Sequence, residues 1–76
     1  MILGNWIELK FGSQKRLNDS LLLGRDSVNR WYNHDPKKLF MYVPQLARFS
    51  DTPVDEVIRM IEDRVKDVKA GRNEPR

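Results

Sequence analysis

The stretch SQKRLNDSLLLGRDSVNRW, residues 13–31, constrains the fold of this chain more than any other part of it. Its apolar residues form two groups at helical spacing, and a short apolar run that ends in Gly24 separates them. The first group contains Leu17 and Leu21, and the second contains Val28 and Trp31. The pattern predicts two short helices that pack on each other across a tight corner, while the outer face of the second helix stays polar.

Length and composition exclude several classes of protein. A chain of 76 residues forms one domain with a small core, and it contains no Cys. Disulfides, thiolate metal sites and Cys nucleophiles are therefore excluded. The longest apolar run, Leu39–Val43, is too short to cross a bilayer, and the first residues lack the basic start of a signal peptide. We expect a cytoplasmic protein without a membrane partner.

Positive charge is concentrated in one part of the chain. The net charge is +3. Residues 10–38 carry seven Lys or Arg and three acidic residues, whereas residues 39–76 carry seven of each. The basic surplus lies on and beside the predicted two-helix corner, where it favours contact with a polyanion such as DNA. An accidental cluster on a solvated surface would give the same count.

Residues 5–11, NWIELKF, are predicted to form a short first helix with Asn5 as its cap. The side chains expected to face inward are Trp6, Ile7 and Leu9. A short edge strand is the alternative, because Trp, Ile and Phe also suit strands. Gly12 ends this element under either interpretation.

The two helices of the corner have recognisable ends. Ser13 is placed to cap the second helix, which extends to about residue 21 or 22. Gly24 interrupts the helical pattern, and a third helix is predicted over residues 25–33. A proline three residues further on disfavours helix before it and marks the stop.

The segment after the corner is ambiguous at first and then helical again. Residues 37–43, KKLFMYV, allow a loop, a strand or the start of a helix. A fourth helix is predicted over residues 44–49, because Pro44 suits a first helical position. Its inward side chains are expected to be Leu46, Ala47 and Phe49.

A fifth helix is predicted over residues 53–70. Thr52 is placed as its cap, Pro53 suits its first position, and Gly71 follows as a stop. Two acidic residues complement the dipole at its start, Asp55 and Glu56. Residues 1–71 then form a single domain, and residues 72–76 form a loose tail.

The apolar residues of the fifth helix lie in one stripe, which comprises Val54, Val57, Ile58, Ile61, Val65 and Val68. Eighteen helical residues span about 27 Å, whereas a chain of this length has a radius of gyration of about 11 Å. The second half of the stripe, Ile61, Val65 and Val68, is therefore predicted to overhang the core and form a homodimer interface. Burial within one subunit is the alternative.

The polar face of the third helix carries side chains that match base edges. At 100° per residue, Val28, Trp31 and Tyr32 fall within one arc. The opposite side carries Asp26, Asn29, Arg30 and Asn33, with Arg25 and Ser27 on its flanks. Arg pairs with guanine, Asn pairs with adenine, and Asp accepts from cytosine. A helix that reads the DNA major groove has this arrangement, although a solvated helix face has the same composition.

Several residues at matching spacing resemble the helix-turn-helix of the Cro/repressor (XRE-like) family over residues 13–58. They are Ser13-Gln14, Leu17, Leu21, Leu23, Val28 and Trp31, and downstream Leu46-Ala47 and Val54-Asp55-Glu56-Val57. The chain differs at Asn18, Leu22 and Gly24, where the family has a small residue, the turn glycine and a Ser or Thr cap. The resemblance implies an all-α, five-helix, lambda-repressor-like domain from a bacterium or a phage-infected cell.

The same resemblance implies the roles of individual residues. Base reading falls to Arg25, Asp26, Ser27, Asn29 and Arg30, and phosphate contacts fall to Gln14, Lys15, Asn33, Lys37 and Lys38. Phosphate contacts set position and affinity, whereas base contacts set sequence choice. The expected function is a transcriptional regulator that binds a near-palindromic double-stranded DNA operator as a homodimer.

Other chemistry has few candidates in the sequence. His34 is the only His, without an acidic or metal-binding partner at useful spacing, and no phosphate-cradling glycine loop is present. We expect no enzyme activity, no metal or cofactor, and no small-molecule ligand. Trp31 has the ring to stack on a single-stranded base, but its position favours the core.

The alternative function is a protein-interaction module of the antitoxin or phage-inhibitor type, which binds through the fifth helix or Leu39–Val43.

Overall fold

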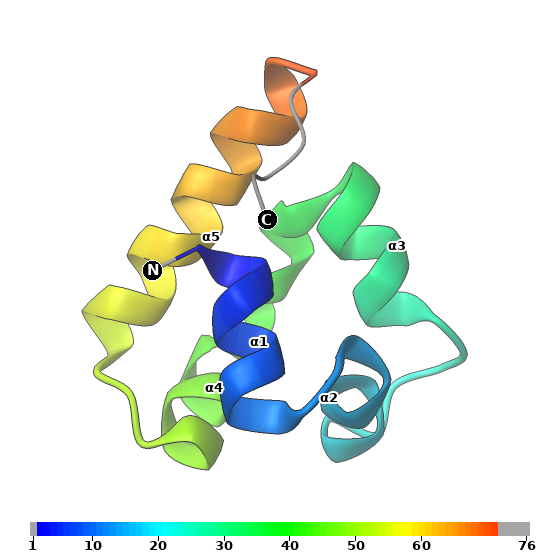
Figure 1. Ribbon diagram of the computed structural model, residues 1–76, viewed down its shortest axis with the longest axis vertical. Coiled ribbons are helices and arrows are strands. Elements are labelled where there is room, and N and C mark those ends of the chain that lie inside the picture. Colours follow the sequence, from blue (N-terminus) through cyan, green and yellow to red (C-terminus); the bar gives the residue numbers. More distant parts are fainter. Residues whose placement is uncertain (1, 72–76) are drawn as a thin grey trace.

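The computed structural model describes residues 2–71, which contain five α-helices, one 3-10 helix and no strand (Figure 1). In chain order they are α1 (Leu3–Phe11), α2 (Gln14–Ser20), α3 (Ser27–His34), the 3-10 helix η1 (Pro36–Tyr42), α4 (Val43–Ser50) and α5 (Val54–Lys69). The predicted all-α class is confirmed, and the radius of gyration is 11.2 Å. Within the described residues, no helix has the length and apolar character that crossing a bilayer requires.

The first segment is a helix rather than a strand, but it begins earlier than predicted. Because α1 starts at Leu3, Asn5 lies inside the helix and is exposed, so the prediction that Asn5 is the cap is wrong. The early start adds Leu3 to the buried face beside Trp6 and Ile7. Leu3, rather than Leu9, completes the arc with Trp6 and Ile7, and Leu9 lies outside that arc and is exposed, contrary to prediction.

Gly12 ends α1 as predicted, and its backbone angle favours glycine. Its φ is +91°, which L side chains rarely adopt. An added Cβ would lie 3.1 Å from Cδ of Arg16, the third residue of α2. The chain therefore turns from α1 into α2 at a position that tolerates no side chain without strain.

The ambiguous segment after the corner is helical. Residues 36–42 form η1, which runs directly into α4 at Val43. Leu46 and Ala47 face inward as predicted, but Phe49 is exposed, and the prediction for it is wrong. Ser50 takes the inward position instead, and its Oγ donates to the carbonyl oxygen of Leu46 at 2.6 Å. Ser50 can be buried because the preceding turn satisfies its hydroxyl.

The start of α5 also differs from prediction. Thr52 does not cap α5, since its Oγ1 accepts a hydrogen bond from Nε1 of Trp6 at 3.3 Å and donates to the carbonyl oxygen of Ser50. Thr52 therefore ties α1 to the α4–α5 connection. The helix ends at Lys69, and Gly71 follows with φ +72° as a stop, as predicted. The predicted loose tail, residues 72–76, lies outside the described residues.

The core uses side chains from every element, and α5 packs against α1, α3, η1 and α4. Of the four predicted anchors of the corner, Leu17 and Val28 are fully buried, and Leu21 and Trp31 are partly buried against the core. Ile61 is also fully buried, so the prediction that it contacts a second subunit is wrong. Val65 packs against the core and Val68 is half-buried. The other helices cover the middle of α5, and this explains why less of its apolar stripe overhangs than its length suggested.

Candidate nucleic-acid interface

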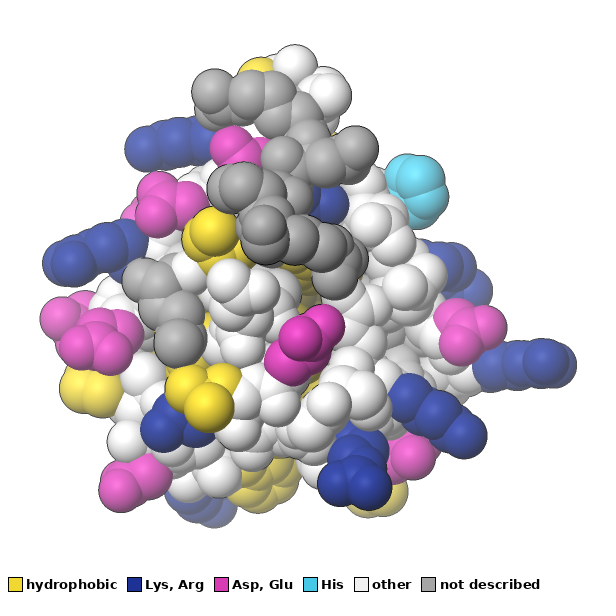
Figure 2. Space-filling model, in the orientation of Figure 1, with side chains coloured by type: hydrophobic (Ala, Val, Ile, Leu, Met, Phe, Trp, Pro, Cys, Tyr) yellow, Lys and Arg dark blue, Asp and Glu magenta, His cyan; other side chains and the backbone are white. Residues whose placement is uncertain are grey.

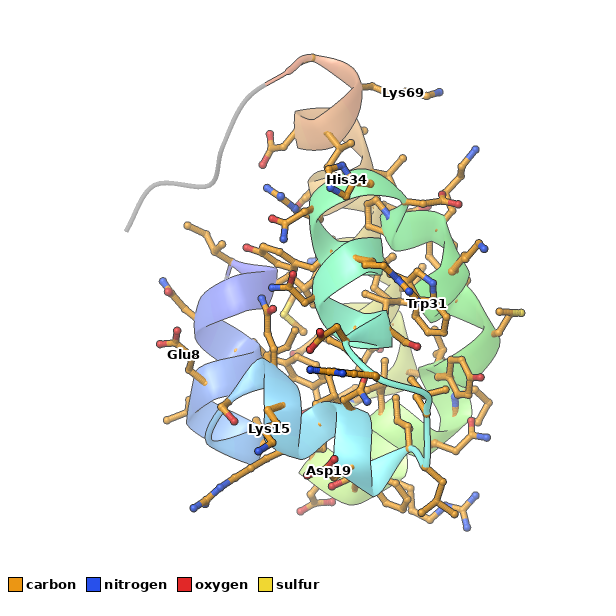
Figure 3. The ribbon with its side chains drawn as sticks, turned by 90° about the vertical axis from the view of Figure 1, so that its right-hand side faces the viewer. Glu8, Lys15, Asp19, Trp31, His34 and Lys69 are labelled. Carbon is orange, nitrogen blue, oxygen red and sulfur yellow. The ribbon has the colours of Figure 1, made fainter. Side chains whose placement is uncertain are left out.

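The corner predicted from residues 13–31 is present, with a longer turn. In Figures 1 and 3, α2 runs across the foot of α3, and the two helices pack together. Ser13 caps α2 as predicted, because its Oγ accepts from the backbone N–H of Arg16 at 3.1 Å. Helix α2 ends at Ser20 and α3 begins at Ser27. Arg25 and Asp26 therefore precede α3, contrary to the predicted start at residue 25.

Asn18 holds the corner together through three hydrogen bonds. Its Nδ2 donates to the carbonyl oxygens of Leu23 at 3.3 Å and Gly24 at 2.8 Å. Its Oδ1 accepts from the buried backbone N–H of Val28 at 2.8 Å. One buried side chain thus satisfies two carbonyls of the turn and one of the orphan N–H groups at the start of α3. It ties α2, the turn and α3 to a single geometry.

Sequence reasoning missed this role of Asn18, although a signal was present. On a helical wheel, Asn18 falls within the same 100° arc as Leu17 and Leu21, which face the core. A buried amide needs partners, and irregular backbone next to it offers unpaired carbonyls and N–H groups. A polar residue on the inward arc, in the last turn of a helix, is therefore a sign of a turn clamp.

Two residues of the turn adopt the left-handed conformation without being glycine. Leu22 has φ +55° and Asp26 has φ +59°. Leu22 stands where the resembled family has its turn glycine, and its side chain is 92% exposed. Asp26 immediately precedes α3, and its conformation is incompatible with a helical residue. This is the physical reason that α3 starts later than predicted.

Most predicted base-reading residues are exposed, with one exception. Arg25, Asp26, Asn29 and Arg30 are exposed on the turn and on α3. Ser27 is only 6% exposed, and its Oγ donates to the carbonyl oxygen of Gly24 at 3.1 Å. The prediction that Ser27 reads a base is therefore wrong, because its hydroxyl is already used inside the turn.

The exposed polar side chains of α2 and α3 are linked to each other. Nδ2 of Asn29 donates to Oε1 of Gln14 at 3.0 Å, and Nδ2 of Asn33 donates to the carbonyl oxygen of Asn29 at 2.9 Å. Gln14 and Asn29 also line an open hollow of about 470 Å³ between α2 and the start of α3. Its lining comprises Gln14, Lys15, Asn18, Asp19, Arg25, Asp26 and Asn29.

Charge around this hollow is mixed. Lys15 and Arg25 line it together with Asp19 and Asp26. In Figure 3, Lys15 and Asp19 both lie on the side of α2 that faces the viewer, below α3. Figure 2 shows Lys and Arg side chains gathered at the lower right, over α2 and α3, with acidic side chains among them. The surface is suited to selective polar contacts more than to indiscriminate attraction of phosphate.

The remaining predicted contact residues do not line this hollow. Asn33 is exposed on α3, and Lys37 and Lys38 are exposed on η1, outside the hollow. Trp31 is half-buried, packs against the core and stacks on Tyr42 with ring centroids 5.8 Å apart. The core position favoured for Trp31 is thus confirmed, and the stack connects α3 to η1.

The inner side of α3 is fastened to α5 by a buried arginine. Arg64 is 3% exposed, its Nε donates to the carbonyl oxygen of Tyr32 at 2.8 Å, and its guanidinium lies 4.1 Å from the centroid of the Tyr32 ring. Nη1 of Arg64 has no partner within residues 2–71. Burial lowers the pKa of Arg64, and the nearby Asp67 partly opposes this shift. A cation is favourable here because it contacts the carboxyl end of α3.

Comparisons with known proteins add no further assignment. No family model, no curated protein and no solved structure matches this chain. The functional interpretation therefore depends on the geometry of the α2–α3 corner and on the chemistry of its exposed residues.

Proposed function

We propose that this protein binds double-stranded DNA with α3 in the major groove and regulates transcription from the bound site. The observation that carries the proposal is the corner held by Asn18, which presents a helix whose exposed face is polar. That face carries Asn29, Arg30 and Asn33, and the turn before it carries Arg25. A short polar helix supported by a second helix that crosses it is the arrangement by which helix-turn-helix proteins read bases.

The proposed contacts follow from exposure and side-chain chemistry. Arg25 and Arg30 reach base edges and select guanine, while Asn29 selects adenine. Asp26 accepts from cytosine or disfavours other bases. Phosphate contacts fall to Gln14, Lys15 and Asn33, which border the reading residues, and Lys37 and Lys38 extend the basic surface along η1.

The arrangement of the helices and the operator are part of the same proposal. Five α-helices with the corner at α2 and α3 are consistent with a lambda-repressor-like domain of the Cro/repressor type. One such domain covers half of an operator, so a homodimer on a near-palindromic site, with half-sites roughly 34 Å apart, is proposed. Occupancy of this site would block or recruit polymerase.

Titration of labelled DNA fragments, followed by fluorescence anisotropy at several salt concentrations, tests the proposal. We expect binding that weakens as salt rises and that prefers one sequence by about a thousandfold or more over random DNA. Binding without sequence preference, or no binding at low salt, would overturn it.

Three alanine variants separate the proposed roles. Arg25→Ala should reduce the preference for the selected sequence about tenfold, because a base contact is lost. Lys15→Ala should weaken binding to all sequences alike and lower the salt slope by about one. Lys69→Ala removes the same charge at the far end of α5 (Figure 3) and should change neither quantity. Equal effects of the first two variants would contradict the assigned roles.

A second candidate function has one observation in its favour. Phe40 and Met41, within the segment proposed as a protein-binding region, are exposed apolar side chains on η1. A protein-interaction module would use such residues and would be indifferent to DNA. A stoichiometric complex with another protein, together with no DNA binding in the titration above, would favour this function over the first.

A further inference from the structure

The 3-10 helix η1 presents cationic and apolar side chains in aligned pairs. With three residues per turn, residues three apart lie above one another. One row, Pro36 and Leu39, is buried and faces the core. The other two rows point outward and pair Lys37 with Phe40 and Lys38 with Met41, all four of which are exposed. We call these four residues the η1 face.

The apolar half of the η1 face is explained neither by the core nor by DNA. Met41 is 64% exposed and Phe40 is 36% exposed, so both keep apolar surface in contact with water. Side chains of this kind do not bind phosphate, whereas the two lysines beside them attract negative charge. The surface that complements the η1 face is therefore apolar and acidic at once.

The chain carries such a surface at the first turn of α5. Val54 is 48% exposed, and Asp55 and Glu56 are both exposed in the same turn. We call these three residues the α5 start. The two carboxylates of the α5 start complement the two lysines of the η1 face in charge, and its exposed valine complements the exposed apolar side chains. The surfaces lie on neighbouring elements, because α4 connects η1 to α5 and contacts both (Figure 1).

We propose that the η1 face of one copy of this protein docks on the α5 start of a second copy. Both surfaces belong to the outside of one subunit, so they meet only between subunits. If a two-fold axis relates the copies, the η1 face of each copy contacts the α5 start of the other. Both η1 faces and both α5 starts are then covered, so the assembly closes as a dimer. Lys37 and Lys38 then face carboxylates, and phosphate binding remains with Gln14, Lys15 and Asn33.

This dimer interface rests on the proposed function, in which a homodimer binds the operator. It takes the place of the predicted interface of Ile61, Val65 and Val68, of which Ile61 is buried. The docked surfaces are small and partly electrostatic. We expect a dissociation constant on the order of 10–100 µM for the free protein, weakening as salt rises.

Sedimentation velocity of the full chain over a range of concentrations, without DNA, tests the interface by charge exchange. The double variants K37E/K38E and D55K/E56K should each weaken self-association at least about tenfold, because like charges then meet. An equimolar mixture of the two variants should restore dimers, since both contacts are again between opposite charges. The variant K15E/R16E makes the same change in net charge on α2 and should dimerise like the unmodified protein.

The apolar contribution is tested separately with Phe40→Ser and Met41→Ser. Each should weaken the dimer about tenfold or more while the circular dichroism spectrum stays that of the folded helices. A protein that remains monomeric up to about 1 mM, or a dimer insensitive to the charge exchange, overturns the interface. Failure to bind DNA would overturn the proposed function alone, because the sedimentation measurement contains no DNA.

Discussion

The α2–α3 corner and the α5-centred core are held together by different forces. In the corner, the side chain of Asn18 makes three hydrogen bonds to backbone groups of the turn and of α3. Around α5, fully buried Val57 and Ile61 pack with Leu39 of η1 and with the other helices. Hydrogen bonds are directional, whereas apolar burial depends mainly on area. The corner therefore sets a geometry, and the core supplies most of the stability.

The largest effect is expected from the core. Ile61→Ala should lower the free energy of unfolding by about 3 kcal/mol, because it removes buried methylenes and leaves a cavity. Urea denaturation followed by circular dichroism measures the loss. The protein that remains folded should bind DNA with unchanged affinity, since the corner is intact.

A small domain can unfold altogether after such a change, so a milder variant accompanies it. Ile61→Val should cost about 1 kcal/mol and leave a folded protein. If either variant weakened DNA binding of the folded fraction, packing of the core would also affect the DNA-binding geometry of the corner.

Asn18→Ala should be the next most costly change, at about 2–3 kcal/mol, because the buried N–H of Val28 loses its acceptor and the carbonyls of Leu23 and Gly24 each lose a donor. Unlike the core variant, it should also weaken DNA binding of the folded protein about tenfold, since the turn no longer has a single geometry. Denaturation and anisotropy titration measure the two quantities on the same sample.

Asn33→Ala is the matched control for that prediction. Asn33 is exposed and makes one hydrogen bond, from its Nδ2 to the carbonyl oxygen of Asn29. Its replacement should change stability by less than about 0.5 kcal/mol. An equal loss of stability in Asn18→Ala and Asn33→Ala would show that the buried hydrogen bonds of Asn18 stabilise the protein no more than those of an exposed amide.

The same contrast explains what could be predicted from the sequence. Helical spacing placed Leu17, Val28 and Leu46 in the core correctly, because apolar burial follows a simple period. It failed at Leu9 and Phe49, because Leu3 and Ser50, which lie outside the predicted bounds of these short helices, complete the buried faces instead. The predicted caps also failed, because Asn5 lies inside α1 and the hydroxyl of Thr52 bonds to Trp6 and Ser50 instead.

The site was predictable in its residues more than in its geometry. Exposure of Asn29 and Arg30 follows from the wheel of α3 and needs no tertiary information, whereas Arg25 is exposed in the turn before that helix. The buried Ser27 and the clamp of Asn18 depend on hydrogen bonds across the turn, which no local pattern specifies. Arg64 lies 32 residues from its partner Tyr32, so sequence spacing gave no sign of that contact.

Arg64 joins the two regions, and its replacements should have intermediate effects. Arg64→Met should cost about 1 kcal/mol, because it loses the bond to Tyr32 but also removes a buried N–H without a partner. Arg64→Lys should cost about 2 kcal/mol, because it keeps a buried charge and loses the planar contact with the ring. Thermal and urea denaturation rank the two. A lysine variant more stable than the methionine variant would show that the charge itself holds α3.

The smallest expected effect is a gain in stability, at Leu22. Its left-handed backbone, with φ +55°, is unfavourable for leucine, and its side chain contributes almost no burial because it is 92% exposed. Leu22→Gly should therefore raise the free energy of unfolding by about 0.5–1 kcal/mol, the strain released minus the entropy that glycine loses on folding. DNA affinity should stay the same, because the hydrogen bonds of Asn18 already define the turn.

Leu22→Ala is the matched control, since it removes the same exposed side chain but keeps the strain, and it should leave stability nearly unchanged. A loss of stability in the glycine variant alone would mean that the entropy glycine loses on folding exceeds the strain released, and an equal loss in both variants would mean that the leucine side chain stabilises the corner.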